Sequence, residues 1–310
     1  MSETSSPNTR AVVIVSGGDA ISPFTTPDAA CTFGLAAGNT DTALREFLLA
    51  RGHRVFTSPA MNARGPVVEQ LTGFGPFGGM PFELPDTMTV NSTGDIDLAG
   101  EHLARFLGFL HTDYGVESLD IVAHSMGGLF SRSAIRVLQK TGSPIVVRSL
   151  TTLGTPWAGS IVGDYTIGDA DLAACAGHPF MEKVVQEFKK RADTIPSGAA
   201  QQVTERYLMG AGGWNEFQAG VLDEIPVTLI GGSIFEAEGD PKYWPTDGLV
   251  SVSSAHAVGV SDAVLPHRRT FTFARTHSIF ISDAVGLAEE TALTWDPEVL
   301  EVVHDAIVAV

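Results

Sequence analysis

The feature that most constrains the fold of this chain is a short apolar run that ends at a serine flanked by small residues. Residues 118–132 read S-L-D-I-V-A-H-S-M-G-G-L-F-S-R, so Ser125 follows a predicted strand and precedes a predicted helix. Small residues two places away on either side, Ala123 and Gly127, are what a sharp strand-to-helix turn requires. The N-terminus of the following helix favours negative charge beside the serine hydroxyl. We interpret Ser125 as a catalytic nucleophile, although a serine in this place can also serve only as a helix cap.

The segments around this turn alternate between strand and helix patterns. Residues 11–15 read A-V-V-I-V, a continuous apolar run that is typical of a parallel strand covered on both faces. Spacing and composition predict further strands at residues 53–56, 145–150, 226–230 and 269–274, and helices at residues 40–50, 97–110, 126–140, 180–191 and 200–207. This order predicts an α/β fold with a mostly parallel sheet.

Length and composition favour one domain over two. The chain has 310 residues, of which 44% are hydrophobic, enough for one large α/β domain with an insertion. We expect a single domain over residues 1–310, with a flexible tail at residues 1–10. Residues 160–224 lie between two predicted strands and carry broken helical patterns, so we predict that they form a helical cap or lid.

Charge and cysteine content restrict the partners. The formal net charge is −17, which argues against binding to nucleic acid or to anionic membranes. No stretch reaches the roughly 18 to 20 apolar residues of a membrane helix, so we expect no integral membrane association. Without a recognisable secretory signal, we expect a cytoplasmic protein unless a signal was removed. Cys31 and Cys175 lack metal-ligand spacing, and whether they pair is left open.

We predict a long loop at residues 57–94, because they are rich in Gly, Pro, Phe and Met and show neither the helical nor the strand period of apolar residues. Loops of this length in compact domains are usually functional or mobile. We therefore take Phe74, Phe77 and Phe82, together with Met80, as candidate residues of a pocket rim. The alternative is that these side chains only fasten the loop to the body of the protein.

An acid and a histidine follow Ser125 at the ends of later predicted strands. Asp247 lies in the turn-rich segment Y-W-P-T-D-G-L-V-S, and His277 follows the predicted strand at residues 269–274. A serine becomes a strong nucleophile when a histidine takes its proton and an acid orients that histidine. The order Ser, Asp, His is that of the α/β-hydrolases. Asp240 and Asp262 are alternative acids, and His256 and His267 are alternative bases.

An oxyanion hole requires two backbone N–H groups near the nucleophile. One should come from the residue after the nucleophile, Met126, and the other from the loop after the first strand. Gly18 is the first candidate in that loop and Asp19 the second. Asp19 is also a candidate substrate-binding residue.

The chain resembles the bacterial α/β-hydrolase lipases and esterases. Residues 16–18 (S-G-G) occupy the place of the H-G loop of that family, A-H-S-M-G-G matches its nucleophile turn, residues 154–160 (G-T-P-W-A-G-S) are similar to its G-T-P-H-x-G-S, and residues 246–251 (T-D-G-L-V-S) match its acid loop. The resemblance implies a six-strand core sheet with helices on both faces, a Ser-His-Asp triad and ester hydrolysis without a cofactor. Some related lipases bind calcium, but we trace no carboxylate set for it and predict no metal.

Two positions depart from the family pattern. Ser16 stands where the H-G loop has histidine, and Trp157 stands where histidine is usual after G-T-P. The second departure places a large aromatic side chain near the implied acyl pocket, so Trp157 is a candidate substrate-binding residue. The alternative for Trp157 is packing in the core.

Together these features predict a serine carboxylic-ester hydrolase that acts through an acyl-enzyme on Ser125. Its substrate would be a small-molecule or lipid-like ester with an apolar acyl or alcohol part. One alternative is an acyltransferase or a lactone- or amide-cleaving enzyme with the same triad, since the fold does not select the acceptor. A second alternative is a non-catalytic binding protein of the same fold. The oligomeric state is left open.

Overall fold

A computed structural model describes residues 9–29, 40–67, 84–194 and 198–310. The candidate rim residues Phe74, Phe77, Met80 and Phe82 lie outside the described residues, and so do Cys31 and all but the end of the expected tail at residues 1–10.

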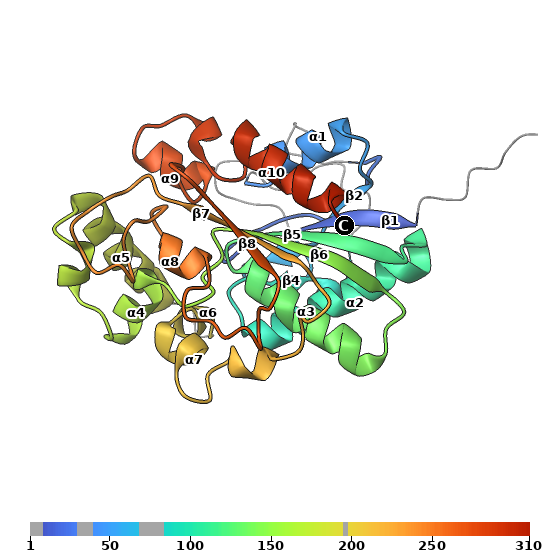
Figure 1. The fold of residues 1–310 in the computed structure, drawn as a ribbon, viewed down its shortest axis with the longest axis horizontal. Coiled ribbons are helices and arrows are strands. Elements are labelled where there is room, and N and C mark those ends of the chain that lie inside the picture. Colours follow the sequence, from blue (N-terminus) through green and yellow to red (C-terminus); the bar gives the residue numbers. More distant parts are fainter. Residues whose placement is uncertain (1–8, 30–39, 68–83, 195–197) are drawn as a thin grey trace, which may run out of the picture.

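A six-stranded sheet forms the centre of the fold (Figure 1). Its strand order is β2-β1-β5-β6-β7-β8, and every neighbouring pair is parallel. The strands are β1 (Arg10–Val15), β2 (Val55–Thr57), β5 (Ser118–His124), β6 (Val146–Leu153), β7 (Val227–Gly232) and β8 (Arg268–Phe273). The expected parallel sheet is therefore confirmed, with each predicted strand within a few residues of an observed one.

Helices cover both faces of the sheet. The α-helices are α1 (Thr42–Ala50), α2 (Ile96–Tyr114), α3 (Gly127–Thr141), α4 (Ile161–Ile167), α5 (Pro179–Ala192), α6 (Ala199–Gln202), α7 (Glu205–Met209), α8 (Val252–Ala255), α9 (Ile279–Ala284) and α10 (Pro297–Val308). Figure 1 shows α2 and α3 on one face and α1 and α10 on the other.

The apolar run of β1 explains why both faces are covered. Ala11, Val13 and Val15 join the core cluster with α2 and α3, whereas Val12 and Ile14 join the cluster with α1 and α10. Successive side chains of a strand point to opposite faces, so a strand between two helix layers is apolar at every position.

The ends of α2 show how local sequence sets the helix bounds. The Asp95 side chain accepts a hydrogen bond from the Leu98 N–H at 3.0 Å and caps the N-terminus. Gly115 ends the helix in the left-handed conformation (φ 64°), which glycine adopts without steric cost. These caps extend the helix beyond the predicted residues 97–110, because the apolar pattern marks only its buried face.

The strand order reverses between β1 and β5, since β2 lies on one side of β1 and β5 on the other. Open parallel sheets place ligands at such a reversal, beyond the carboxyl ends of the strands. Two segments leave the sheet there, namely the loop after β1, which begins at Ser16, and the turn after β5 at Ser125. The topology thus brings the two predicted halves of an oxyanion hole side by side.

The helical segment, residues 160–224, lies between β6 and β7 and contains α4 to α7. Figure 1 shows α4 and α5 at the end of the sheet opposite the start of β1. The predicted helix at residues 200–207 is two helices, α6 and α7. It is interrupted because Thr204 caps α7, with its hydroxyl accepting from the Tyr207 N–H at 3.1 Å.

Part of residues 57–94 is more ordered than the composition suggests. Two short strands, β3 (Ala60–Met61) and β4 (Val90–Asn91), pair in parallel to form a second sheet, and a 3₁₀ turn occupies Asp86–Met88. Strands of two residues are too short to produce a period in the sequence. Across the described ranges, each helix is too short or too polar to cross a membrane.

Candidate active site

Ser125 occupies a strained turn between β5 and α3. Its φ is 55°, the left-handed region, which costs a non-glycine residue about 1–2 kcal/mol. The surroundings hold it there: the Ser125 N–H donates to the Leu153 carbonyl at 2.8 Å, and the Thr155 hydroxyl donates to the Ser125 carbonyl at 2.7 Å. Strain of this kind persists where neighbouring contacts over-determine the backbone, commonly at functional sites.

Asp247 and His277 are a buried, hydrogen-bonded pair. Nδ1 of His277 lies 2.7 Å from Oδ2 of Asp247, and the His277 N–H donates to the Asp247 carbonyl at 2.8 Å. The other carboxylate oxygen, Oδ1, accepts from the N–H groups of Leu249 and Val250 at 2.9 and 2.8 Å. A carboxylate bound in this way fixes the tautomer and the orientation of the imidazole.

Gly154, the first residue after β6, packs against this pair. A Cβ at position 154 would lie 2.9 Å from both Asp247 Oδ2 and His277 Nδ1, and its φ of 59° favours glycine. Gly154 of the G-T-P motif thus leaves room for the acid and the histidine. Thr155 of the same motif holds the serine turn. The motif is visible in the sequence, but neither role can be predicted from it.

His124 links the serine turn to the histidine loop. Its Nε2 donates to the His277 carbonyl at 2.8 Å, and the two ring centroids are 4.7 Å apart. Burial lowers the pKa of His124 from 6.5 to about 3, so this ring is neutral at physiological pH. Among the described residues, the Ser125 hydroxyl makes no hydrogen bond to the His277 ring.

The loop after β1 lies against the serine. A Cβ on Gly17 would collide with the side chain of Ser125, and one on Gly18 would come within 2.9 Å of the Met126 sulfur. The Asp19 N–H donates to the Ser92 carbonyl at 3.3 Å. Within the described part of the chain, the N–H groups of Gly18 and Met126 have no hydrogen-bond partner.

A mostly apolar cavity of about 150 Å³ opens beside Ser125. The body of the protein and the helical segment both line it: Gly18, Asp19, Ser92, Thr93, Ser125, Met126, Pro156, Ser160, Val162, Phe188, Arg191, Ala192, Ala199, Ala200, Val203, Leu249 and Val250. Arg191 of α5 forms an ion pair with Asp19 at 2.5 Å, so its charge is compensated. No sequence motif marks Ser92, Thr93 or Arg191, so they could not be predicted from the sequence.

Trp157 does not reach this cavity. Its side chain is fully buried and contacts Arg132, whose guanidinium lies 4.3 Å from the ring centroid. The indole N–H donates to the Thr152 hydroxyl at 3.2 Å. Of the two interpretations of Trp157, these contacts favour packing in the core, because the ring lies between Thr152 of β6 and Arg132 of α3.

The alternative acids and bases lie in other contacts. The Asp240 carboxylate accepts from the Lys242 N–H, and Asp262 is exposed and pairs with Arg268. His256 bonds to the Phe271 carbonyl at 3.0 Å, and His267 is exposed on the loop before β8. In the described ranges, no three His, Cys, Asp or Glu side chains group so that they could hold a metal ion.

The parallel sheet and its strand order define an α/β-hydrolase fold. Residues 84–191 match the family described as "Putative serine esterase (DUF676)", so the resemblance to serine esterases is confirmed for this part of the chain. The match includes β5, the Ser125 turn and the G-T-P motif.

Several solved structures of lipases and esterases are similar to this chain. The Bacillus licheniformis lipase BlEst2 in its propeptide form shows 16% identity and a TM-score of 0.48 over 89% of this chain and 48% of its own, so this chain spans about half the length of that protein. The Pyrococcus furiosus esterase Pf2001 shows 14% identity and a TM-score of 0.45 over 97% and 81% of the two chains. The Bacillus subtilis carboxylesterase CesB shows 10% identity and a TM-score of 0.46 over 98% and 85%. No curated protein matches the sequence.

Proposed function

We propose that this protein hydrolyses carboxylic esters through an acyl-enzyme on Ser125. The observation that carries the proposal is the buried Asp247–His277 pair, which is tied by His124 to the strained turn at Ser125. The match to a serine esterase family supports the same reaction. The hydroxyl-to-imidazole bond would form when substrate is bound, since catalytic hydrogen bonds are often long or absent without it.

Each residue has a distinct role in the proposed reaction. His277 takes the proton from the Ser125 hydroxyl as its oxygen attacks the ester carbonyl carbon, and Asp247 stabilises the imidazolium that results. The N–H groups of Gly18 and Met126 stabilise the negative carbonyl oxygen. Gly18 is favoured over Asp19 because the Asp19 N–H already donates to Ser92. His277 then protonates the leaving alcohol, and water releases the acid by the same steps.

The cavity suggests the kind of ester. Its walls are mainly apolar, which favours an apolar acyl or alcohol group. Its volume of about 150 Å³ is below the roughly 300–1,000 Å³ of common ligand pockets. We therefore propose small-molecule esters with short acyl chains as substrates, and the helical segment as the cap over them.

The test is hydrolysis of p-nitrophenyl esters from acetyl to palmitoyl by the wild type and by Ser125→Ala. We expect highest kcat/KM for the short chains and a loss of at least about 10³-fold in the variant. Substantial turnover by Ser125→Ala would overturn the acyl-enzyme, and a preference for palmitoyl would overturn the short-chain part. Labelling of the wild type by a fluorophosphonate, absent in Ser125→Ala, would separate an enzyme from a binding protein of the same fold.

A further inference from the structure

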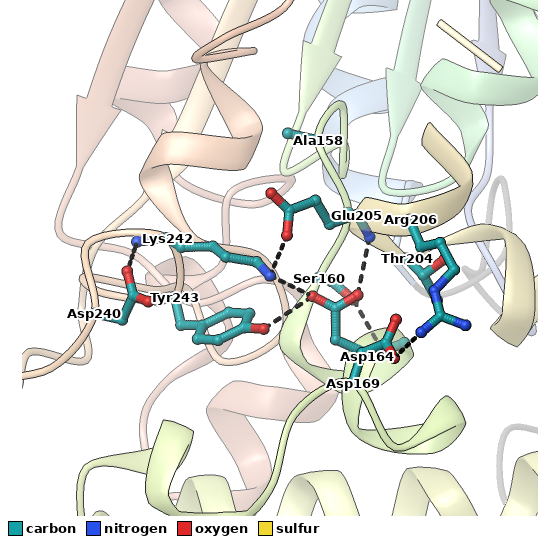
Figure 2. A network of polar contacts seen from close by, with 12 residues as sticks. Ala158, Ser160, Asp164, Asp169, Thr204, Glu205, Arg206, Asp240, Lys242 and Tyr243 are labelled. Carbon is teal, nitrogen blue, oxygen red and sulfur yellow. Dashed lines mark hydrogen bonds and ion pairs between the residues drawn. The ribbon is translucent and has the colours of Figure 1, made fainter. Parts of the chain in front are cut away.

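A buried carboxylate outside the cavity joins the helical segment to the loop that carries Asp247 (Figure 2). Asp164 on α4 is 1% exposed. Its Oδ1 accepts from the Glu205 N–H at 2.9 Å, at the start of α7. Its Oδ2 accepts from the Tyr243 hydroxyl at 2.9 Å and from the Lys242 ammonium at 3.0 Å. Lys242 and Tyr243 reach it from the side opposite the Glu205 N–H.

The donors around Asp164 are held in their donating forms. Burial raises the pKa of Tyr243 to about 12, so its phenol keeps its proton. Burial works to lower the pKa of Lys242, but hydrogen bonds to Glu205, Tyr243 and Asp164 raise it above its usual range. The ammonium therefore stays charged between the Asp164 and Glu205 carboxylates. A buried charge that loses its partner is strongly unfavourable, so these contacts form a stiff connection.

A short series of bonds leads from this cluster to Asp247. The Lys242 carbonyl accepts from the Ser251 hydroxyl at 2.6 Å. Ser251 pairs with Thr246 in an isolated β-bridge, and Asp247 follows Thr246 directly. One end of the turn that presents the Asp247 carboxylate is thus bonded to residue 242, and the other end is held through Ser251. Holding Lys242 and Tyr243 in place holds this turn in place.

A nearby ion pair in the same helical segment provides a contrast. Asp169, after the end of α4, pairs with Arg206 of α7 and is partly exposed (Figure 2). It connects two parts of the helical segment to each other, as Asp164 does through Glu205. Only Asp164 of these two acids also contacts the loop of Asp247. Variants of the two acids can therefore be compared. Both lose a contact within the helical segment, but only a variant of Asp164 also loses the contact with the loop of Asp247.

We propose that Asp164 is a positioning residue that fixes the Asp247 loop, so that the helical segment and the catalytic acid are mechanically coupled. The inference rests on the proposed function, in which Asp247 orients His277. Asp164 does not itself line the cavity beside Ser125, and its bonds to Lys242 and Tyr243 assign its effect on the reaction to the loop. Small displacements of a catalytic group can cost about a hundredfold in rate, which sets the scale of the effect.

The test compares Asp164→Asn with Asp169→Asn, each in the wild type and in the Asp247→Asn background. Far-UV circular dichroism and urea unfolding give the folded fraction of each variant, and every kcat is corrected for it. We expect Asp164→Asn to lower kcat about tenfold to a hundredfold with KM changed less than about twofold. We expect Asp169→Asn to change both constants less than about twofold.

The Asp247→Asn background shows whether Asp164 acts by positioning Asp247 or only by stabilising the fold. If Asp164 acts through Asp247, Asp164→Asn has no further effect on kcat once residue 247 is Asn, because coupled residues are not additive. Equal fold-losses in both backgrounds, or equal effects of Asp164→Asn and Asp169→Asn, would overturn the proposal. Should Asp164→Asn fail to fold, Tyr243→Phe removes one donor only, and we expect a smaller fall in kcat that also vanishes in the Asp247→Asn background.

Failure of the proposed function gives a different result. Unchanged kcat in Asp247→Asn alone would show that Asp247 is not the catalytic acid, whatever Asp164→Asn does in the wild type. If no ester is turned over, the rate of fluorophosphonate labelling at Ser125 replaces kcat. A wild type with neither turnover nor labelling would overturn both the proposed function and the coupling.

Discussion

The carboxylate of Asp247 has donors on both of its oxygens: the His277 Nδ1 lies 2.7 Å from Oδ2, and two backbone N–H groups lie within 2.9 Å of Oδ1. All three partners donate, so position 247 requires two acceptors. An asparagine offers one acceptor and one NH₂ group, which would face a donor whichever way the amide is turned. The three donors therefore require a carboxylate at position 247. A carboxylate also stabilises the imidazolium in the proposed reaction.

Asp247→Asn is therefore expected to lower kcat by about 10³- to 10⁴-fold while the fold is retained. The measurement is kcat for a short p-nitrophenyl ester, with circular dichroism as the check on folding. Asp262→Asn is the matched control, because that carboxylate is exposed and pairs only with Arg268 at 3.0 Å. Full activity of Asp247→Asn, or equal losses in the two variants, would contradict the assignment of the acid.

Gly17 is expected to tolerate no side chain, because an added Cβ would collide with Ser125 and come within 2.9 Å of the His124 carbonyl. We expect Gly17→Ala to lower kcat at least about tenfold and the free energy of unfolding by about 1–3 kcal/mol. Gly18→Ala is the comparison: its Cβ would meet the mobile Met126 thioether at 2.9 Å, and its N–H is kept. A similar loss in both variants would show that any side chain added to this loop lowers kcat and stability, and that the collision with Ser125 is not the cause.

The order of strands and helices could be predicted because parallel strands leave continuous apolar runs and amphipathic helices leave a 3.6-residue period. β1 and α2 show these two signals clearly. The placement of Ser125, Asp247 and His277 on the segments that follow β5, β7 and β8 could be predicted for the same reason. β3 and β4 could not, because two residues carry no period.

Contacts between distant segments were the part that the sequence could not supply. Trp157 reads equally well as a pocket residue or a core residue, and its packing against Arg132 favours the second. The bond between Asp164 and Tyr243 joins residues far apart in the sequence, and neither belongs to a recognisable motif. A charged residue in a helical pattern ordinarily predicts an exposed face, whereas Asp164 is buried because three donors converge on it.

His124 gives a pH dependence of stability with a defined sign. Burial lowers its folded-state pKa from 6.5 to about 3, so below pH 6.5 the unfolded chain binds a proton that the folded chain does not. Its contribution to stability is therefore complete above pH 6.5 and is lost as the pH falls toward 3, by about 1.4 kcal/mol per pH unit. His124→Gln keeps a donor for the His277 carbonyl and removes the titration. Urea unfolding between pH 4 and 8 should show a shallower loss of stability toward acid in the variant, and parallel curves would contradict the shifted pKa.

Two glycines within α2 allow the packing between α2 and α3 to be tested. Nothing lies within 4 Å of a Cβ added at Gly108, so Gly108→Ala should raise the free energy of unfolding by about 0.5–1 kcal/mol through helix propensity alone. A Cβ at Gly100 would collide with Ser133 of α3 and lie 3.0 Å from the Ala134 nitrogen. Because the backbone there cannot yield, Gly100→Ala should instead destabilise the protein by about 1–3 kcal/mol. Urea unfolding of both variants measures the difference, and equal stabilisation by the two would show that α2 and α3 are not packed at Gly100 and Ser133.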